Sequence, residues 1–327
     1  MIKVLNLTKK FNGLIAVDNI SFSLEKGETL ILLGTSGCGK TTTLKMINRL
    51  IEATAGKVFI EGKNIQDQKP EELRKQIGYV IQSIGLFPHY TVEQNIAIVP
   101  NLLKWDKKQT VSRTREILDL VGLPPDDFLK RKPEELSGGQ QQRVGLARAL
   151  VADPSVVLFD EPLGALDPIT RRQIQKEFNN LETLLNKTMI LVTHDVFEAF
   201  ELGDKICLMD GGKIKQIGTA KELIFSPQND FVINFFQGNR YQLELMVLTL
   251  KDIMDEITKK EYKGEAVHEF YENARILDVL EAMENTPHME SILGIKSNDH
   301  NKILQTTSEA IMLAFYKKRA KLLQWIL

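Results

Sequence analysis

The sequence has 327 residues, of which 43% are hydrophobic and 26% charged, and its formal net charge is -1. This balance excludes a general attraction to nucleic acid or anionic membranes, although it leaves room for a local charged patch. The length exceeds that of one ordinary core and predicts two domains. The sequence contains no apolar run of about 18 residues, so we expect no membrane-spanning helix.

The apolar pattern predicts alternating strands and helices. Ile2 to Leu7 and Ala16 to Leu24 alternate apolar and polar side chains, as half-buried strands do. Further strands are expected at 29–33, 57–60, 77–82, 156–159 and 189–192. Helical spacing is found at 92–99, 107–121, 139–152, 170–185 and 196–202. Breaks within the helical part are expected at Pro100, Pro124, Pro125 and Pro133. The result is an α/β sheet domain with a mostly helical insertion.

The stretch from Gly34 to Thr42 reads GTSGCGKTT and fits the phosphate-binding pattern G-x-x-x-x-G-K-[ST] between a predicted strand and helix. Its glycines let backbone N–H groups approach phosphate oxygens, and the helix points its positive end at the same anion. We expect Lys40 to reach the β- and γ-phosphates and Thr41 to ligate Mg²⁺. The expected nucleotide contacts are Gly34, Thr35, Ser36, Gly37, Cys38, Gly39, Lys40, Thr41 and Thr42.

An apolar strand at 156–159 ends in a pair of carboxylates, Asp160 and Glu161. Beside a phosphate loop, such an Asp holds Mg²⁺. The adjacent Glu can accept a proton from the water that attacks the γ-phosphate. Taken alone, the pair would equally fit a solvated strand end.

Residues 136–143 read LSGGQQQR and place a serine and two glycines at the start of a predicted helix. Ser137 and Gly139 could form a second anion site there. The alternative is an ordinary helix cap with Ser137 as the capping residue. One ATP needs only one phosphate loop, so a second anion site has to be explained.

These motifs together resemble the ATP-binding subunits of ABC transporters. GTSGCGKT, Gln82, LSGGQ, VVLFDE, GALD (164–167) and Thr193-His194-Asp195 occur in the order found in that family. The resemblance implies a P-loop NTPase α/β fold with a helical subdomain at about 83–153. It also implies ATP and Mg²⁺ as cofactors, and a head-to-tail homodimer in which LSGGQ closes over the ATP of the partner.

The resemblance implies roles for single residues as well. Glu161 is similar to the general base of the family, and His194 to the switch that contacts the γ-phosphate; Lys40 acts with them. The implied Mg²⁺ ligands are Thr41, Gln82 and Asp160.

Three further positions follow from the resemblance. Phe11 is similar to the aromatic residue that stacks on adenine, where the family more often has Tyr. Asp167 is similar to the residue that couples the two sites of the dimer. Thr35 stands where relatives often carry Pro, and we expect no chemical consequence from this difference.

Four stretches resemble the subfamily that imports quaternary amines such as glycine betaine, carnitine and choline: LKMINRLIE, YVIQSIGLFPHYTVEQNIAIVPNLLKW, VGLPPDD and GALDPITRRQ. The resemblance implies a peripheral protein on the cytoplasmic face of the cell membrane. Its partners would be two permease subunits, contacted near Gln82 to Tyr90, and an extracytoplasmic substrate-binding protein, with no nucleic acid. One alternative is an importer of another small solute, such as an amino acid. A remote alternative is a DNA-maintenance ATPase, which would need a coiled coil before LSGGQ.

We expect the ATP-binding domain at 1–238 and a C-terminal region at 239–327 with a regulatory or dimerising role. Patterns at 242–254, 274–285, 291–295 and 309–327 give a small α/β region that resembles one reduced CBS module, a β-α-β-β-α unit. A merely packing appendage is the alternative.

The last expected helix, residues 309–327, has two different faces at about 100° per residue. The predicted apolar face contains Met312, Phe315, Tyr316, Leu322, Leu323 and Ile326, and the other side contains Lys317, Lys318, Lys321 and Trp325. Arg319 falls inside the apolar stripe and needs a partner. The plain interpretation is a packed helix with a solvated lysine face. The alternative hypothesis is that the lysines touch anionic lipid headgroups and are released by salt.

Overall fold

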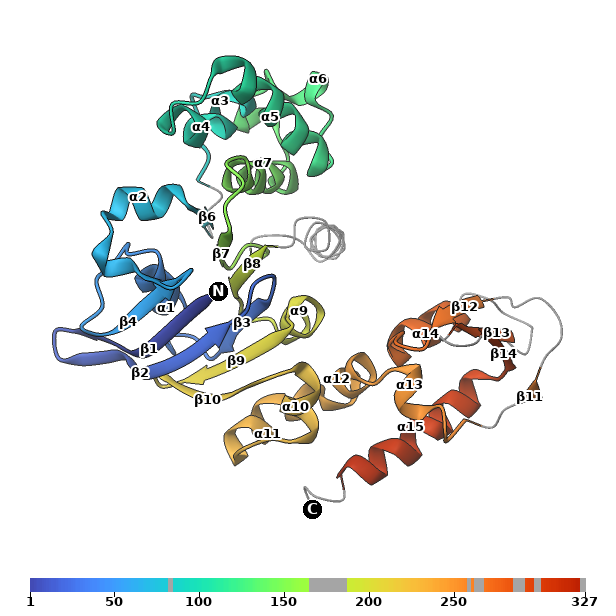
Figure 1. Cartoon of the computed structure of the whole chain (residues 1–327). Helices are drawn as coiled ribbons and strands as arrows, with labels where there is room; N and C mark the ends of the chain where they lie inside the picture. The colour runs from blue at the N-terminus through green and yellow to red at the C-terminus, as the bar shows by residue number, and fades with distance from the viewer. Residues whose placement is uncertain are drawn as a thin grey trace. The chain divides into compact units, whose positions relative to one another are not determined.

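In the computed structural model the chain forms two compact units, Met1–Ile217 and Gly218–Leu327 (Figure 1). The structure describes residues 1–81, 85–164, 187–257, 260–261, 268–284, 292–296 and 301–323. The boundary expected at residue 238 lies inside the second unit and stays a prediction. No helix among the described residues is long and apolar enough to cross a membrane.

A six-stranded sheet forms the core of the first unit. Its strands are β3 (Thr29–Gly34), β6 (Ile77–Val80), β7 (Val156–Asp160), β8 (Thr188–Val192), β9 (Lys205–Asp210) and β10 (Lys213–Gly218), in the order β10-β9-β3-β8-β7-β6. The neighbouring pairs β9-β3, β3-β8, β8-β7 and β7-β6 are all parallel. β3, β7 and β8 are buried along their whole length, which is why they are continuous apolar runs. Because they are parallel, their carboxyl ends meet at one edge of the sheet.

A smaller antiparallel sheet has the order β2-β1-β4-β5. Its strands are β1 (Ile2–Phe11), β2 (Leu14–Leu24), β4 (Ala55–Ile60) and β5 (Lys63–Asn64). β1 and β2 form a longer hairpin than the alternation predicts, because the turn at Asn12 and Gly13 adds Leu14↔Phe11 and Ile15↔Lys10 pairs beyond the alternating segments. Irregularities in the register of β1 hide this extension from a period-2 pattern.

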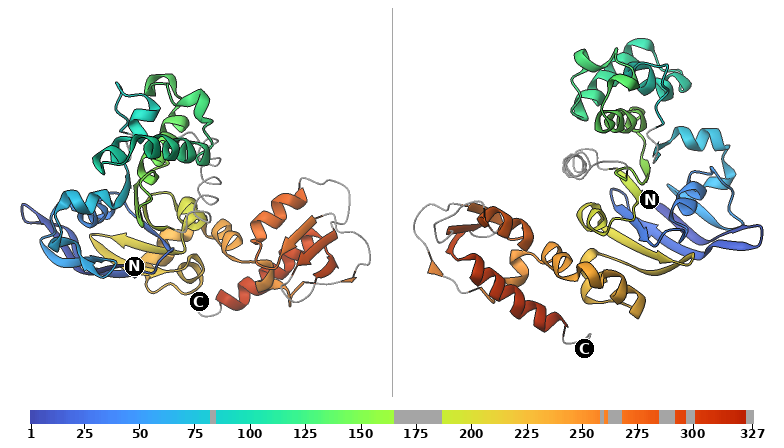
Figure 2. Two further views of the ribbon diagram at one scale, coloured as in Figure 1. Left: turned by 45° about the horizontal axis from the view of Figure 1, so that its top comes forward. Right: turned by 180° about the vertical axis from the view of Figure 1, so that it is seen from behind.

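The helices of the first unit include α1 (Lys40–Ile47), α2 (Pro70–Lys75), α3 (Val92–Ile96), α4 (Ile98–Leu102), α5 (Lys107–Leu120), α6 (Pro125–Phe128), α7 (Gly138–Leu150) and α9 (Val196–Leu202). Helices α3 to α7 form a separate group beyond β6 and β7 (Figures 1 and 2). This group is the predicted helical insertion. Pro100 does not break it as expected: it lies in the first turn of α4, where a missing N–H costs no intrahelical bond. The helix ends instead at Ala97, between α3 and α4.

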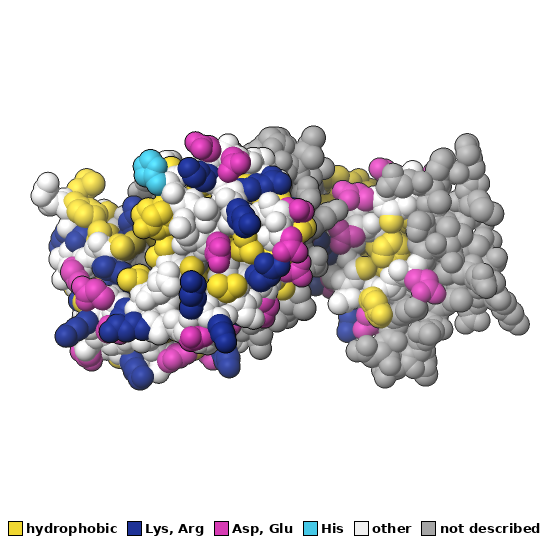
Figure 3. All heavy atoms as spheres, turned by 90° about the horizontal axis from the view of Figure 1, so that it is seen from above, with side chains coloured by type: hydrophobic (Ala, Val, Ile, Leu, Met, Phe, Trp, Pro, Cys, Tyr) yellow, Lys and Arg dark blue, Asp and Glu magenta, His cyan; other side chains and the backbone are white. Residues whose placement is uncertain are grey.

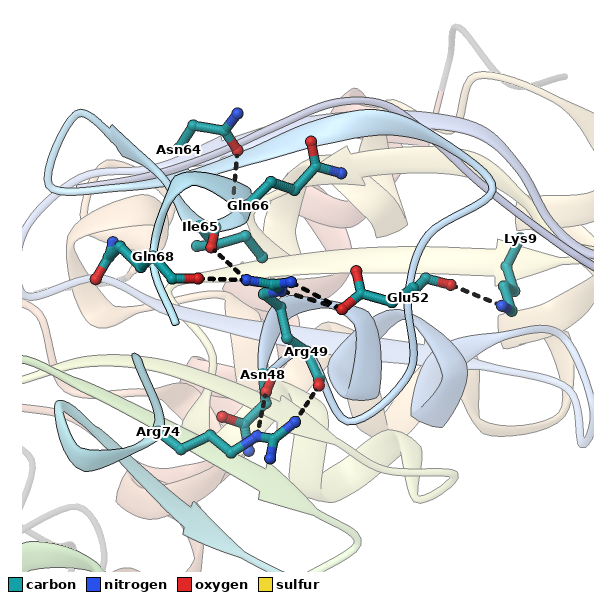
Figure 4. Close-up of polar contacts among 9 residues, drawn as sticks. All are labelled: Lys9, Asn48, Arg49, Glu52, Asn64, Ile65, Gln66, Gln68 and Arg74. Carbon is teal, nitrogen blue, oxygen red and sulfur yellow. Dashed lines mark hydrogen bonds and ion pairs between the residues drawn. The ribbon is translucent and has the colours of Figure 1, made fainter. Parts of the chain in front are cut away.

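Two arginines fasten the end of α1 (Figure 4). Arg49, at φ +47°, donates to the carbonyl oxygens of Ile65 (3.0 Å) and Gln68 (2.6 Å). Arg74 of α2 donates to the carbonyl oxygens of Asn48 (3.2 Å) and Arg49. The carbonyl groups of Asn48 and Arg49 follow the last turn of α1 and would otherwise need water as a partner. Arg49 thus anchors the end of α1 to residues 65 and 68, and Arg74 anchors it to α2, which leads directly into β6.

The second unit contains α10 (Ala220–Phe225), α11 (Asp230–Phe236), α12 (Arg240–Val247), α13 (Leu250–Ile253), α14 (Ile276–Glu284) and α15 (Ser308–Leu323), with strands β11 (Lys260–Glu261), β12 (His268–Tyr271), β13 (Ile292–Lys296) and β14 (Asn301–Gln305). The sheet order is β11-β14-β13-β12, with β12 parallel and β14 antiparallel to β13. The chain order β12-α14-β13-β14-α15 is a β-α-β-β-α sequence of elements. A relation to CBS modules stays a prediction.

The burial of α15 differs from its helical projection. Ile311, Ala314 and Phe315 are buried, whereas Tyr316 is exposed. Lys321, expected on the solvated face, forms an ion pair with Glu256. The apolar stripe is therefore rotated towards Ile311, because α15 packs on both α13 and α14. Trp325 and Ile326 lie outside the described residues.

Candidate functional site

The phosphate loop connects the end of β3 to the start of α1 and borders a cavity of about 560 Å³. The cavity is lined by Ser36, Gly37, Cys38, Gly39, Lys40, Thr41, Thr42, Glu161 and His194. Most of the expected nucleotide contacts and the two expected catalytic residues after β7 and β8 therefore surround one space. The edge of the parallel sheet explains this, because β7 and β8 deliver their carboxyl ends beside the loop.

Two glycines of the loop are required by their surroundings. Gly34 has φ +151°, and a Cβ atom there would lie 2.0 Å from the carbonyl oxygen of Met209. Gly39, the residue before α1, has φ +103°, and its Cβ would lie 2.5 Å from the carbonyl oxygen of Ala16. Both distances are far below contact distance, so no other residue fits either position without moving the backbone of a neighbouring strand.

Lys40 is buried at the start of α1, and its ammonium group crosses the loop. Nζ donates to the carbonyl oxygens of Gly34 (2.8 Å) and Thr35 (3.0 Å). The positive charge is thereby held at the mouth of the loop, where a phosphate would arrive. Nearby, burial raises the pKa of the Cys38 thiol, so this cysteine stays protonated and is a poor nucleophile.

Asp160, at the end of β7, is buried and has both carboxylate oxygens engaged. Thr41 donates its hydroxyl to Oδ1 at 2.8 Å, and the Tyr79 hydroxyl lies 3.4 Å from Oδ2. A hydroxyl and a carboxylate at this distance offer the hard oxygen ligands that Mg²⁺ prefers, so these residues fit the ion. Tyr79 is not anticipated by the sequence motifs. Its only signal is its place in β6, which pairs with β7 so that Tyr79 lies beside Leu158, two residues before Asp160.

Glu161 and His194 form a pair across the cavity. His194 Nδ1 lies 3.3 Å from Glu161 Oε2. Glu161 has φ +49°, and its backbone N–H donates to the carbonyl oxygen of Val192 at 3.0 Å, which fixes the turn after β7 to the end of β8. The His194 side chain is 63% exposed, so its ring can meet a ligand as well as Glu161.

Thr35 and Phe11 lie outside the cavity lining. Thr35 donates its hydroxyl to Asp210 at 3.0 Å, so this side chain does have a structural contact, contrary to the expectation that it has no consequence. Phe11 ends β1 as an exposed ring, with the ammonium of Lys9 4.8 Å from its centre. Its contact with adenine stays a prediction.

Ser137 and Gly139 also lie outside the cavity lining, at the start of α7. Ser137 is the N-cap residue: its hydroxyl accepts from the backbone N–H of Gln140, whose side chain accepts from Ser137 N–H. The capping interpretation is therefore correct for the single chain. It does not exclude an anion brought by a second chain, because Ser137 is exposed. Gln82 and Asp167 fall outside the described residues.

Comparison with known proteins decides the family. The ABC transporter family model matches residues 17–164. The glycine betaine uptake system ATP-binding protein YehX of Escherichia coli (strain K12) is 46% identical over 270 residues, covering 82% of this chain and 87% of that protein. The chain belongs to the ABC transporter family. The recognition made from the motifs is thus confirmed.

Two further members of the family agree in sequence and in fold. The choline transport ATP-binding protein OpuBA of Bacillus subtilis (strain 168) is 52% identical over 73% of this chain, which spans 63% of that protein. A dimeric post-hydrolysis structure of an ATP-binding cassette bound to ADP and Pi is 33% identical, with a TM-score of 0.60, and covers 67% of this chain and 98% of its own. The predicted P-loop α/β fold is confirmed by this match.

Proposed function

We propose that the chain is the ATP-hydrolysing subunit of an importer of quaternary amines such as glycine betaine, carnitine or choline. The observation that carries the proposal is the single cavity shared by the phosphate loop, Glu161 and His194. The named relatives, which serve choline transport and glycine betaine uptake, support the substrate class.

The residues of the cavity divide the chemistry among them. The phosphates of ATP lie along the loop, where backbone N–H groups and the Lys40 ammonium offset their charge. Thr41, Asp160 and Gln82 would hold Mg²⁺, which would supply positive charge to offset that of the phosphates. Glu161 accepts the proton of the attacking water. His194, 3.3 Å away, orients the Glu161 carboxylate and keeps its other ring nitrogen available to the γ-phosphate.

A second copy of the chain completes the site in this proposal. Ser137 and Gly139 begin α7 outside the cavity of their own chain, and Ser137 is exposed. In a head-to-tail homodimer, LSGGQ of one chain covers the γ-phosphate bound by the other. Phe11 stacks on the adenine, and Asp167 couples the two sites. The dimeric state of the related ATP-binding cassette supports this arrangement.

The permease subunits meet the helical subdomain in this proposal. A groove of about 900 Å³ there is lined by residues of α3, α4 and α5 together with Tyr90 and Trp105. Leu102 in the groove is 61% exposed, and Phe87 and Tyr90 beside it are exposed aromatic rings in mutual contact. Buried Asn95 fixes this loop by accepting from Phe87 N–H (2.8 Å) and donating to Tyr90 O (3.2 Å). A groove with exposed apolar side chains and polar residues such as Glu93 and Lys107 along it suits a short amphipathic helix of a partner.

The remaining partners follow from the importer assignment. The chain lies peripherally on the cytoplasmic face of the membrane, and an extracytoplasmic substrate-binding protein delivers the solute. We expect no nucleic-acid partner, because the net charge is -1 and acidic side chains lie among the basic ones on the face drawn in Figure 3. The alternative within the class is another small solute, such as an amino acid.

The test is co-purification of the chain with its membrane partners, followed by ATPase assays in lipid vesicles with the solute-binding protein present. We expect glycine betaine, carnitine or choline to raise ATP turnover and an amino acid to leave it unchanged. Stimulation by the amino acid alone would contradict the substrate class. Isolation of the chain without any membrane protein would contradict the importer assignment.

A further inference from the structure

Glu198, in the first turn of α9, is a buried carboxylate close to the nucleotide cavity that the chemistry above leaves without a role. It is 3% exposed, although charged side chains are rarely buried so completely without a specific partner. Its partner is Thr193, the residue directly before His194. This connects the buried carboxyl group to the exposed imidazole on the cavity wall.

The Thr193 hydroxyl acts both as a hydrogen-bond donor and as an acceptor. The Thr193 hydroxyl donates to the Glu198 carboxylate and accepts from the backbone N–H of Asp195 at 3.0 Å. The Asp195 side chain in turn accepts from the backbone N–H groups of Phe197 (2.9 Å) and Glu198 (3.2 Å). The residues on both sides of His194 are therefore bonded to the start of α9.

The same turn is also attached to the phosphate loop. Thr193 is buried, and its backbone N–H donates to the carbonyl oxygen of Leu32 in β3 at 3.2 Å. β3 leads into the loop two residues later. The position of His194 relative to the loop is thus set by Thr193, and the rotation of the Thr193 hydroxyl is set by Glu198.

We propose that Glu198 is a positioning residue for His194: it holds the Thr193 hydroxyl and so fixes the turn that directs the imidazole towards Glu161. This inference rests on the proposed role of His194. The Thr193 hydroxyl accepts from Asp195 N–H and donates its one proton to Glu198, so its rotation is fixed from both sides.

The test compares Glu198→Leu, Thr193→Val and the double variant in the full chain, by ATP turnover and by binding of a fluorescent ATP analogue. We expect each single variant to lower kcat about tenfold or more, because a small displacement of a catalytic group is costly. Affinity for the analogue should stay within about twofold, since the loop itself is intact. The double variant should lose no more than the stronger single variant, because both changes remove one bond. Glu198→Gln, which keeps an acceptor oxygen, should recover part of the activity.

A matched control exists in the second unit. Thr219 donates its hydroxyl to Glu222 at 3.1 Å, the same pair of residue types at the start of α10. Thr219→Val and Glu222→Leu should leave kcat unchanged, even where they lower the melting temperature. Equal kcat losses in the control pair would overturn the inference by reducing the effect to general destabilisation.

Four other outcomes would also decide the matter. Multiplicative losses in the double variant would show that Glu198 does not act through Thr193, and normal kcat in Thr193→Val would do the same even if Glu198→Leu fails to fold. An inactive His194→Ala with fully active Glu198 and Thr193 variants would overturn the positioning role alone. A fully active His194→Ala would overturn the proposed catalytic role of His194, and the inference with it.

Discussion

Arg319 of α15 donates a hydrogen bond from Nε to the carboxylate of Glu244 in α12, a group that is 0% exposed. Arg240 donates to the other oxygen of the same carboxylate at 2.9 Å. The sequence pattern indicates only that Arg319 needs a partner, because it lies in an apolar stripe. The structure supplies that partner 75 residues earlier in the chain, and the pair fastens the last described helix to the rest of the second unit.

Glu244→Leu should loosen this packing strongly. It leaves two guanidinium groups without their carboxylate, and breaking a buried ion pair typically costs about 3 to 5 kcal/mol. Arg319→Met should cost less, because Arg240 still pairs with Glu244. Hydrogen exchange of α12 and α15 measures the local unfolding free energy of both variants. Equal losses in the two variants would contradict a shared carboxylate.

Glu161→Gln should bind ATP normally and turn it over about 10²- to 10⁴-fold more slowly, because the amide cannot take a proton from water. The variant should also accumulate as an ATP-bound dimer. Equilibrium ATP binding, single-turnover hydrolysis and size-exclusion chromatography measure the three effects. Near-normal turnover would reject Glu161 as the base.

Ser137→Arg should abolish hydrolysis while ATP binding to the isolated chain survives, since Ser137 lies outside the cavity of its own chain. Mixing it with Lys40→Ala subunits should restore part of the activity. In a head-to-tail heterodimer one site then combines an intact loop with an intact LSGGQ. No recovery on mixing, or loss of ATP binding by the isolated Ser137→Arg chain, would argue against the composite site.

Tyr79→Phe should raise the Mg²⁺ concentration needed for ATP binding, because Asp160 loses a hydrogen-bond donor. Partners of a metal ligand typically contribute about 10- to 100-fold in affinity, and we expect the lower end for a contact of 3.4 Å. Burial and the neighbouring Asp160 raise the pKa of Tyr79, so the phenol stays a donor and the effect should be constant below the ordinary tyrosine pKa of about 10. Exposed Tyr271 supplies the control, Tyr271→Phe. An unchanged Mg²⁺ requirement would remove Tyr79 from the site.

The lysines of α15 should differ in their response to anionic lipid. Lys321 pairs with Glu256, and this hydrogen bond lowers the pKa of the Glu256 carboxyl. Lys317 and Lys318 are then the better candidates for headgroups, each worth about 1 kcal/mol near a membrane surface. Transport activation by internal salt in anionic vesicles should weaken in Lys317→Gln/Lys318→Gln and persist in Lys321→Gln. Identical salt activation of all variants would leave α15 a packing helix only.

The sequence predicts those parts of the site whose chemistry dictates the residues. A phosphate loop demands glycines and a lysine at fixed spacing, and a buried parallel strand demands an apolar run, so β3, β7 and β8 are all visible as patterns. Tyr79 and Glu198 are not visible in this way. Each acts through a contact between elements, Tyr79 with Asp160 across two strands and Glu198 with the turn before α9.

In the second unit, too, some elements can be predicted from the local sequence pattern and others cannot. Residues of α14 and α15 have helical spacing and are predictable, whereas β12 and β14 are short strands without a clear alternation. Their pairing depends on β13, which is distant in sequence from β12. The mistaken break at Pro100 has a local cause, because a proline in the first turn of a helix has the same composition signal as one that ends it.

The close contacts of Gly34 and Gly39 restrict substitution at these two positions more than at the residues that they face. The backbone carbonyl oxygens of Met209 and Ala16 occupy the space that a Cβ atom of residue 34 or 39 would need. Every residue type carries a backbone carbonyl oxygen. The side chain at 16, and at buried position 209 any apolar side chain of similar size, can therefore be exchanged without altering the surface that confines the loop. A library randomised at all four positions should retain ATP binding with many residues at 16 and with apolar residues at buried position 209, but only with glycine at 34 and 39.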